Sequence, residues 1–179
     1  MRANTDVAIA FLDGLDPKGR HDLAAIDPDL PNGAPGKIEC ATFFPIDRAK
    51  MRGWIEARQA KKNLYASVNR ARDDAPRNVR LSREHIGLIR AIPADIDVPK
   101  IKTGDPIGQH FHAAREKLLR EVAPKLGDDP MCPPSLTVDS GGGLQAWWQL
   151  KPMLEANSEN VELVQGIGRA IKQRFETEF

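Results

Sequence analysis

Three consecutive glycines, Gly141, Gly142 and Gly143, separate two apolar runs in the stretch TVDSGGGLQAWWQL, residues 137–150. A tight connection between two strands needs one or two residues with positive φ, and glycine adopts that conformation without steric cost. The runs LTV and LQAWWQL are rich in the β-branched and aromatic residues that favour strands. The stretch therefore predicts a β-hairpin with an unusually open, glycine-rich turn.

The composition of this turn also suits an anion. Successive backbone N–H groups in a glycine-rich turn form a concave nest for phosphate oxygens. Ser140 adds a hydroxyl beside the glycines, and Gln145 follows closely enough to reach over the turn. The stretch is neither a P-loop nor a dinucleotide fingerprint, because no Gly-Lys-Ser/Thr and no helix follows. A hairpin without a ligand is the alternative interpretation of the turn taken alone.

A second candidate site lies in RAIPADIDVPK, residues 90–100. In an extended strand, alternate side chains share a face, so Asp95 and Asp97 lie on one face about 7 Å apart. The core-facing positions of the same strand are Ile92, Ala94, Ile96 and Val98. Two carboxylates on one face repel each other and attract a hard cation, for which Mg²⁺ or Mn²⁺ is the natural choice. A solvated strand end is the alternative.

The rest of the sequence bounds the class of protein. A chain of 179 residues with 41% hydrophobic residues suits one domain with a core. The net charge of +1 excludes a basic footprint over the whole chain, so nucleic acid would contact local patches. Cys40 and Cys132 match no metal-binding spacing or disulfide framework, which favours a reducing compartment. We expect a cytoplasmic protein with no membrane partner, because the sequence contains no apolar run of about 18 residues.

Helical and strand patterns alternate along the chain. Helical spacing predicts helices over 6–15, after Asp47, over 107–122 and from about residue 158, with a short helix from Ser82 to Ile89. Alternation predicts strands in KIECATFFP and in NLYASVN, residues 63–69. Such a pattern is typical of a sheet covered by helices, α/β or α+β. We expect residues 1–36 to be an N-terminal helical extension and residues 37–179 to be the main domain.

Taken in order, NLYASVNRAR, IRAIPADIDVPK and SLTVDSGGGLQAWWQL resemble the archaeo-eukaryotic primase superfamily, and most closely the primase-polymerase and RepB-like domains of plasmids, phages and other mobile elements. The resemblance covers about residues 38–150. It implies an α+β fold with an antiparallel or mixed sheet and flanking helices, as in the RRM-like catalytic core of that family.

The resemblance also implies the roles of particular residues. Asp95 and Asp97 match the D-x-D pair that binds the catalytic Mg²⁺ or Mn²⁺ ions, and Ser140–Gln145 matches the motif that contacts the triphosphate. Gln145 stands where many members have histidine, and glutamine can donate a hydrogen bond but cannot be cationic. The family's third acidic ligand has no convincing match, since Glu176 and Glu178 follow a helical pattern. We therefore expect a core that is incomplete at its C-terminus.

The implied reaction is metal-dependent, template-directed nucleotidyl transfer by a DNA primase in replication. Its partners would be nucleoside triphosphates, a single-stranded DNA template and a replicative helicase. Two alternatives remain open at this point. A D-x-D strand also suits a metal-dependent nuclease or a sugar-nucleotide transferase. The acidic pair could instead belong to a non-catalytic replication or DNA-binding module.

Overall fold

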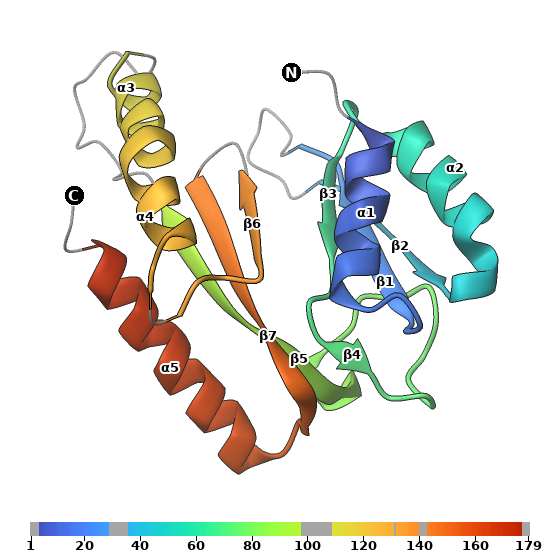
Figure 1. The fold of residues 1–179 in the computed structure, drawn as a ribbon. Coiled ribbons are helices and arrows are strands. Elements are labelled where there is room, and N and C mark those ends of the chain that lie inside the picture. The colour runs from blue at the N-terminus through green and yellow to red at the C-terminus, as the bar shows by residue number, and fades with distance from the viewer. Residues whose placement is uncertain (1–3, 29–35, 98–108, 131, 140–142, 177–179) are drawn as a thin grey trace. The chain divides into compact units, whose positions relative to one another are not determined.

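The structure, a computed structural model, describes residues 4–28, 36–97, 109–130, 132–139 and 143–176 (Figure 1). The chain divides into two compact units. The first unit comprises Met1–Arg90 and Met153–Ala156, and the second comprises Ala91–Pro152 and Asn157–Phe179. Two long strands, β5 (Ile86–Asp97) and β7 (Gly143–Glu155), each contribute residues to both units.

The first unit contains a three-stranded antiparallel sheet in the order β2-β1-β3. Its elements are α1 (Thr5–Leu15), β1 (His21–Ile26), β2 (Ile38–Phe43), α2 (Arg48–Arg58), β3 (Asn63–Ala66) and the short β4 (Arg70–Ala71), which pairs with the start of β5. The residues 1–36 that the sequence suggests as an extension contribute α1 and β1, and β1 is the middle strand of this sheet.

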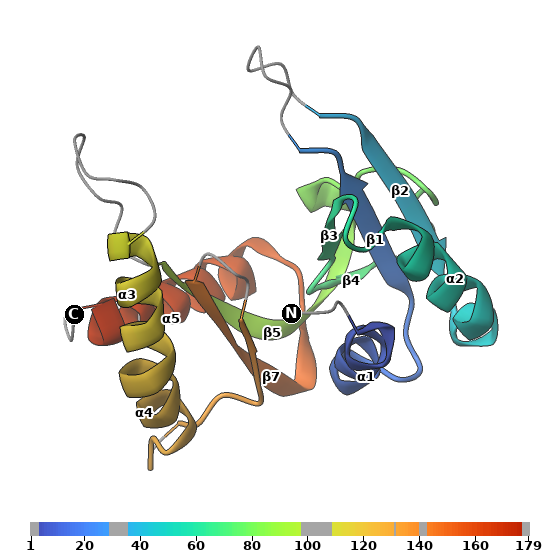
Figure 2. The ribbon, with the colours of Figure 1, turned by 90° about the horizontal axis from the view of Figure 1, so that it is seen from above.

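The core of the first unit lies between its two helices and one face of the sheet. Leu23, Ala41 and Phe43 of the sheet pack against the buried side chains of both helices, which are Ile9, Leu12, Met51 and Ile55. Figure 2 shows α1 and α2 on the same side of β1 and β2. The predicted helices over 6–15 and after Asp47 are present as α1 and α2, although Val7 of α1 is exposed. The alternation of β3 is confirmed, since Leu64 and Ala66 face this core while Tyr65 is exposed.

The second unit consists of the end of β5, most of β7, and helices that flank the sheet. Its other elements are α3 (Gln109–Lys117), a π-helical turn (Leu118–Val122), α4 (Ala123–Gly127), β6 (Leu136–Asp139) and α5 (Ser158–Glu176). Strands β5, β7 and β6 are neighbours in that order, and β6 pairs antiparallel with β7. Leu118, Val122 and Leu126 are buried along one helical face.

The prediction of an α+β protein with antiparallel sheets and flanking helices is confirmed. The predicted helix from Ser82 to Ile89 is wrong, because only Arg83–His85 forms a 3₁₀ turn and β5 begins at Ile86. A strand here pairs Ile86 and Leu88 with β4, and sheet pairing outweighs local helical spacing. Within the described residues, no helix combines the length and apolar character needed to cross a membrane.

Candidate functional site

The predicted carboxylate pair lies at the end of β5. Ile92, Ala94 and Ile96 are buried, with exposed fractions of 7%, 4% and 0%, whereas Asp95 is exposed. This is the expected alternation of a strand with one face on a core. Asp97 is the last residue of β5, but its side chain lies outside what the structure describes, as does all of Val98.

The predicted hairpin is present. Strands β6 and β7 pair antiparallel, with Asp139 opposite Leu144 and Val138 opposite Gln145. Gly143 begins β7 and is buried, and Gln145 is half-buried two residues further on. Ser140, Gly141 and Gly142 lie outside the described residues, so the anion nest of the turn stays a prediction.

The carboxylate strand and the hairpin strand meet at one end of the sheet. The backbone N–H of Ala156, just after β7, donates to the carbonyl of Gly87, near the start of β5, at 3.0 Å. Because β5 and β7 are neighbours, this bond means that they run in opposite directions. The end of β5, with Asp95 and Asp97, therefore lies at the same end of the sheet as the start of β7, with Gly143 and Gln145 (Figure 1).

A cationic side chain that the sequence reasoning did not single out reaches this hairpin. Arg115 of α3 forms an ion pair with Asp139 at the end of β6, and the two side chains are 30% and 29% exposed. Asp139 is therefore a neutralised carboxylate beside the glycine turn and not a free metal ligand. The sequence carried a weak signal for this contact, because Arg115 lies on the polar side of an amphipathic helix, where cations are common.

Both tryptophans of the hairpin strand serve packing. Trp147 and Trp148 are each 7% exposed, and the Nε1–H of Trp148 donates to the carbonyl of Cys132 at 2.8 Å. Rings buried to this degree cannot act as stacking surfaces for bases.

Asp95 and Asp97 stay the predicted metal ligands. Within the described ranges, no three or more histidine, cysteine, aspartate or glutamate side chains gather in a way that could hold an ion. A site built on two carboxylates still suits Mg²⁺ or Mn²⁺, because Mg²⁺ keeps several waters and shares its coordination with substrate phosphates. Asp95 fits this role, since its carboxylate projects from a rigid strand into solvent.

Comparisons with protein-family models, with curated proteins and with solved structures found no match.

Proposed function

We propose that this chain is a DNA primase or primase-polymerase domain that binds a nucleoside triphosphate with a divalent metal ion and acts on a single-stranded DNA template. The observation that carries the proposal is the meeting of two strands. The acidic end of β5 and the glycine-rich start of β7 occupy the same end of one antiparallel sheet. Metal ligands and phosphate-binding amides must meet in this way for phosphoryl or nucleotidyl transfer.

The carboxylates and the glycine-rich turn would bind different parts of the metal–nucleotide complex. Asp95 and Asp97 would hold the metal ions, and bound Mg²⁺ or Mn²⁺ would polarise the transferring phosphoryl group and offset its negative charge. The amides of Gly141, Gly142 and Gly143, with the Ser140 hydroxyl and the Gln145 amide, would orient the triphosphate. The chain's own contribution is positioning and fixed charge, because the nucleotide carries its own leaving group.

Arg115 would also lower the electrostatic repulsion between the hairpin and a triphosphate. Its guanidinium lies at the hairpin and already neutralises Asp139. A carboxylate without such a partner would repel the triphosphate and lower its affinity. The ion pair would therefore reduce the repulsion between Asp139 and a bound triphosphate, while Asp95 and Asp97 would supply negative charge for the metal.

The proposal is tested by calorimetric titration of Mn²⁺, with and without a nucleoside triphosphate. Asp95→Asn and Asp97→Asn should each weaken Mn²⁺ binding by at least about tenfold, equivalent to about 1.4 kcal/mol. Asp128→Asn is the matched control, because Asp128 is an exposed carboxylate of the same unit. If both β5 variants bind Mn²⁺ as tightly as the parent and the control, the metal site is refuted.

Reaction products separate the proposed activity from its alternatives. Metal-dependent nucleotide binding with primer synthesis or extension on a single-stranded template supports the proposal. Cleavage of DNA without added nucleotide would identify a nuclease, and sugar transfer from a nucleotide would identify a transferase of that class. DNA binding that is indifferent to both metal and nucleotide would identify a non-catalytic module.

A further inference from the structure

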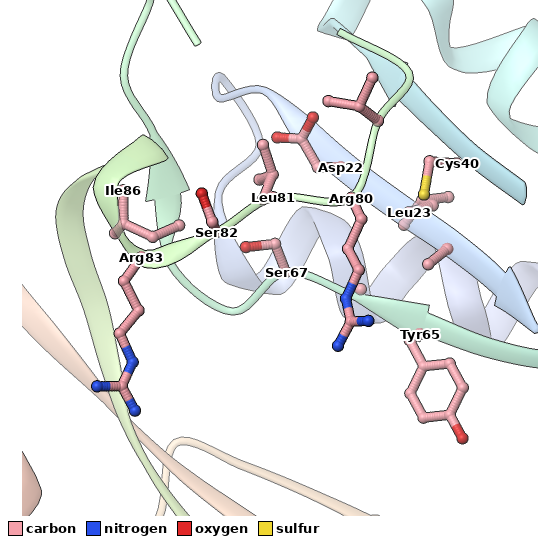
Figure 3. A pocket seen from close by; sticks show the side chains of 13 residues that line it. Asp22, Leu23, Cys40, Tyr65, Ser67, Arg80, Leu81, Ser82, Arg83 and Ile86 are labelled. Atoms are coloured by element: carbon pink, nitrogen blue, oxygen red, sulfur yellow. The ribbon is translucent and has the colours of Figure 1, made fainter. Parts of the chain in front are cut away.

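An open pocket of about 350 Å³ lies within the first unit, on the face of the three-stranded sheet opposite α1 and α2. Asp22, Cys40 and Tyr65 face this side because they alternate with the core residues Leu23, Ala41 and Leu64. The segment from Val79 to Arg83 forms the other side of the pocket (Figure 3). None of these residues belongs to the proposed metal and triphosphate site.

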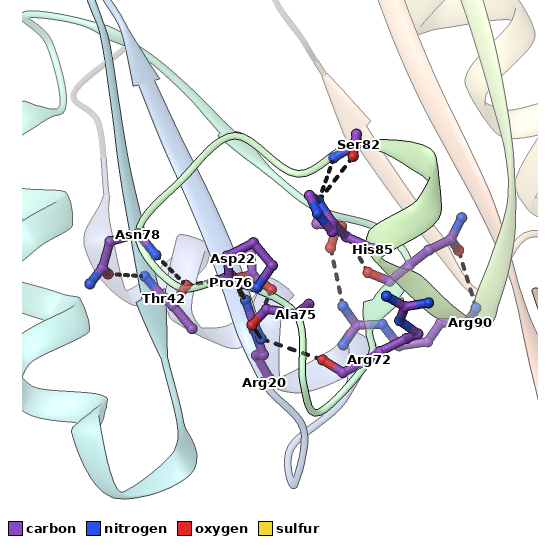
Figure 4. A network of polar contacts seen from close by, with 12 residues as sticks. Arg20, Asp22, Thr42, Arg72, Ala75, Pro76, Asn78, Ser82, His85 and Arg90 are labelled. Atoms are coloured by element: carbon purple, nitrogen blue, oxygen red, sulfur yellow. Dashed lines mark hydrogen bonds and ion pairs between the residues drawn. The ribbon is translucent and has the colours of Figure 1, made fainter.

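The segment that carries the pocket wall is held in place by a network of polar contacts (Figure 4). Arg20, 4% exposed, donates to the carbonyls of Ala75 at 2.9 Å and Pro76 at 2.7 Å. Further along the segment, the Thr42 N–H donates to Asn78 Oδ1 at 2.9 Å, and the Asn78 N–H donates to Thr42 Oγ1 at 3.0 Å. The loop before Arg80 is therefore anchored at several backbone groups, to Arg20 just before β1 and to Thr42 of β2.

Three of the five arginines in the loop that carries this wall already have partners. The loop sequence RARDDAPRNVRLSR contains five arginines, and two of them have acidic partners: Arg70 with Asp73 at 3.5 Å and Arg72 with Asp74 at 3.2 Å. Arg77 stacks over the ring of Phe44 at 4.8 Å.

The remaining two, Arg80 and Arg83, line the pocket and are exposed, and neither forms an ion pair within the described part of the chain. The one acidic residue among the pocket's lining residues, Asp22, is already bound by Arg20 at 2.8 Å. The pocket therefore presents two uncompensated guanidinium groups on an anchored loop. Guanidinium groups recognise phosphate oxygens with paired hydrogen bonds.

An exposed aromatic ring shares the pocket with these charges. Tyr65 is 54% exposed and lies on β3 directly opposite Ala24. In the view of Figure 3, the side chains of Tyr65, Arg80 and Arg83 all extend to the same side. Guanidinium groups that share a pocket with an accessible aromatic ring form an arrangement that binds unstacked nucleotides, with phosphates on the cations and the base stacked on the ring.

We infer that this pocket binds single-stranded nucleic acid, with backbone phosphates held by Arg80 and Arg83 and a base stacked on Tyr65. A single strand suits the pocket better than a duplex, because the bases of a duplex are stacked on one another and cannot reach the ring. The basic residues of α2 are less suitable, since Arg52 pairs with Asp6 at 2.6 Å and Arg58 with Glu39 at 2.9 Å. The inference does not depend on the proposed nucleotidyl transfer.

The test is fluorescence anisotropy of a labelled oligothymidylate with the full chain in EDTA, so that the metal site plays no part. Tyr65→Ala should weaken binding by about 5- to 150-fold, the range that one stacked base contributes, while Tyr65→Phe should bind like the parent. Arg80→Ala and Arg83→Ala should each reduce the slope of log K against log salt by about 0.7. Arg52→Ala, which removes the same charge from α2, is the matched control.

The outcomes are distinct. The inference is overturned if Arg80→Ala and Arg83→Ala bind like Arg52→Ala, if Tyr65→Ala and Tyr65→Phe are equal, or if a duplex of the same sequence binds as tightly as the single strand. Competition by thymidine monophosphate at the oligonucleotide's own affinity would identify a mononucleotide pocket instead. Asp95→Asn should leave this binding unchanged, and Arg80→Ala should leave Mn²⁺ titration unchanged, so failure of either proposal is recognised separately.

Discussion

Replacing Asp22 by asparagine should destabilise the first unit strongly, because it leaves a buried cation without its counter-ion. The Nε and Nη2 groups of Arg20 donate to the Asp22 carboxylate at 2.8–3.0 Å. The two side chains are 3% and 8% exposed. Asparagine keeps the shape and an acceptor for the Thr42 hydroxyl, which donates to Asp22 at 2.7 Å, so the substitution removes charge with little change in packing.

The magnitude follows from the burial. Removing one partner of a buried ion pair costs about 3–5 kcal/mol, because the remaining charge stays desolvated. Arg20 retains its backbone acceptors at Ala75 and Pro76, so we expect a loss near the lower end, about 3 kcal/mol. Typical domains are stable by only about 5–15 kcal/mol, and such a loss is therefore a large share of the total.

The measurement is urea denaturation followed by circular dichroism. Glu56→Gln is the control, because it removes a carboxylate from an exposed ion pair with Arg52, 3.6 Å apart, and should leave the midpoint almost unchanged. Adding Arg20→Met to Asp22→Asn should recover part of the loss, since the double variant no longer buries a lone charge. A loss below about 1 kcal/mol for Asp22→Asn would refute the argument.

Three further predictions concern pH, packing and ligand binding. Burial lowers the pKa of His21 below its ordinary value; Arg90 lowers it further, and Asp16 opposes this in part. The unfolded chain then binds more protons than the folded one, so the free energy of unfolding should fall as the pH drops through about 6.5. His21→Gln should flatten this pH dependence in denaturation series at several pH values. In α5, Gly166→Ala should raise the unfolding free energy by about 0.5–1 kcal/mol, since nothing lies within 4 Å of the added Cβ. Gly168→Ala should gain less or lose stability in the same melts, because its Cβ would lie 3.1 Å from the carbonyl oxygen of Pro93. Gln145→Ala should weaken triphosphate binding by about 0.5–1.5 kcal/mol in the Mn²⁺ titration, and unchanged affinity would remove Gln145 from the site.

The sequence predicted elements whose pattern is local. Helices α1 and α2, the start of α5 at Ser158, strand β2 and the β6–β7 hairpin follow from spacing and turn residues. The faces of β5 were also predictable, since Ile92, Ala94 and Ile96 alternate with the exposed Asp95. In each case the residues within one element decide which side is apolar, and burial of that side decides the rest.

Elements that depend on distant partners could not be predicted in this way. Strand β1 begins with His21 and Asp22 and follows Arg20, residues that usually mark a surface loop. Arg20 and Asp22 are buried because they neutralise each other, and because Arg20 satisfies backbone carbonyls at Ala75 and Pro76, more than fifty residues away in sequence. The helix expected after Ser82 became the start of β5 for a similar reason, since β4 supplies its pairing partner.

The chemistry of the candidate metal and triphosphate site follows from the sequence alone: two carboxylates at alternate positions of a strand, and a glycine-rich turn beside Gln145. The fold adds that the end of β5 and the start of β7 lie together, and that Asp139 is neutralised by Arg115. It also brought Tyr65, Arg80 and Arg83 to one pocket. Periodicity within a strand indicates which face is buried, because side chains alternate between the two faces. Strand neighbours and ion pairs depend instead on the free energy of contacts between residues far apart in the chain.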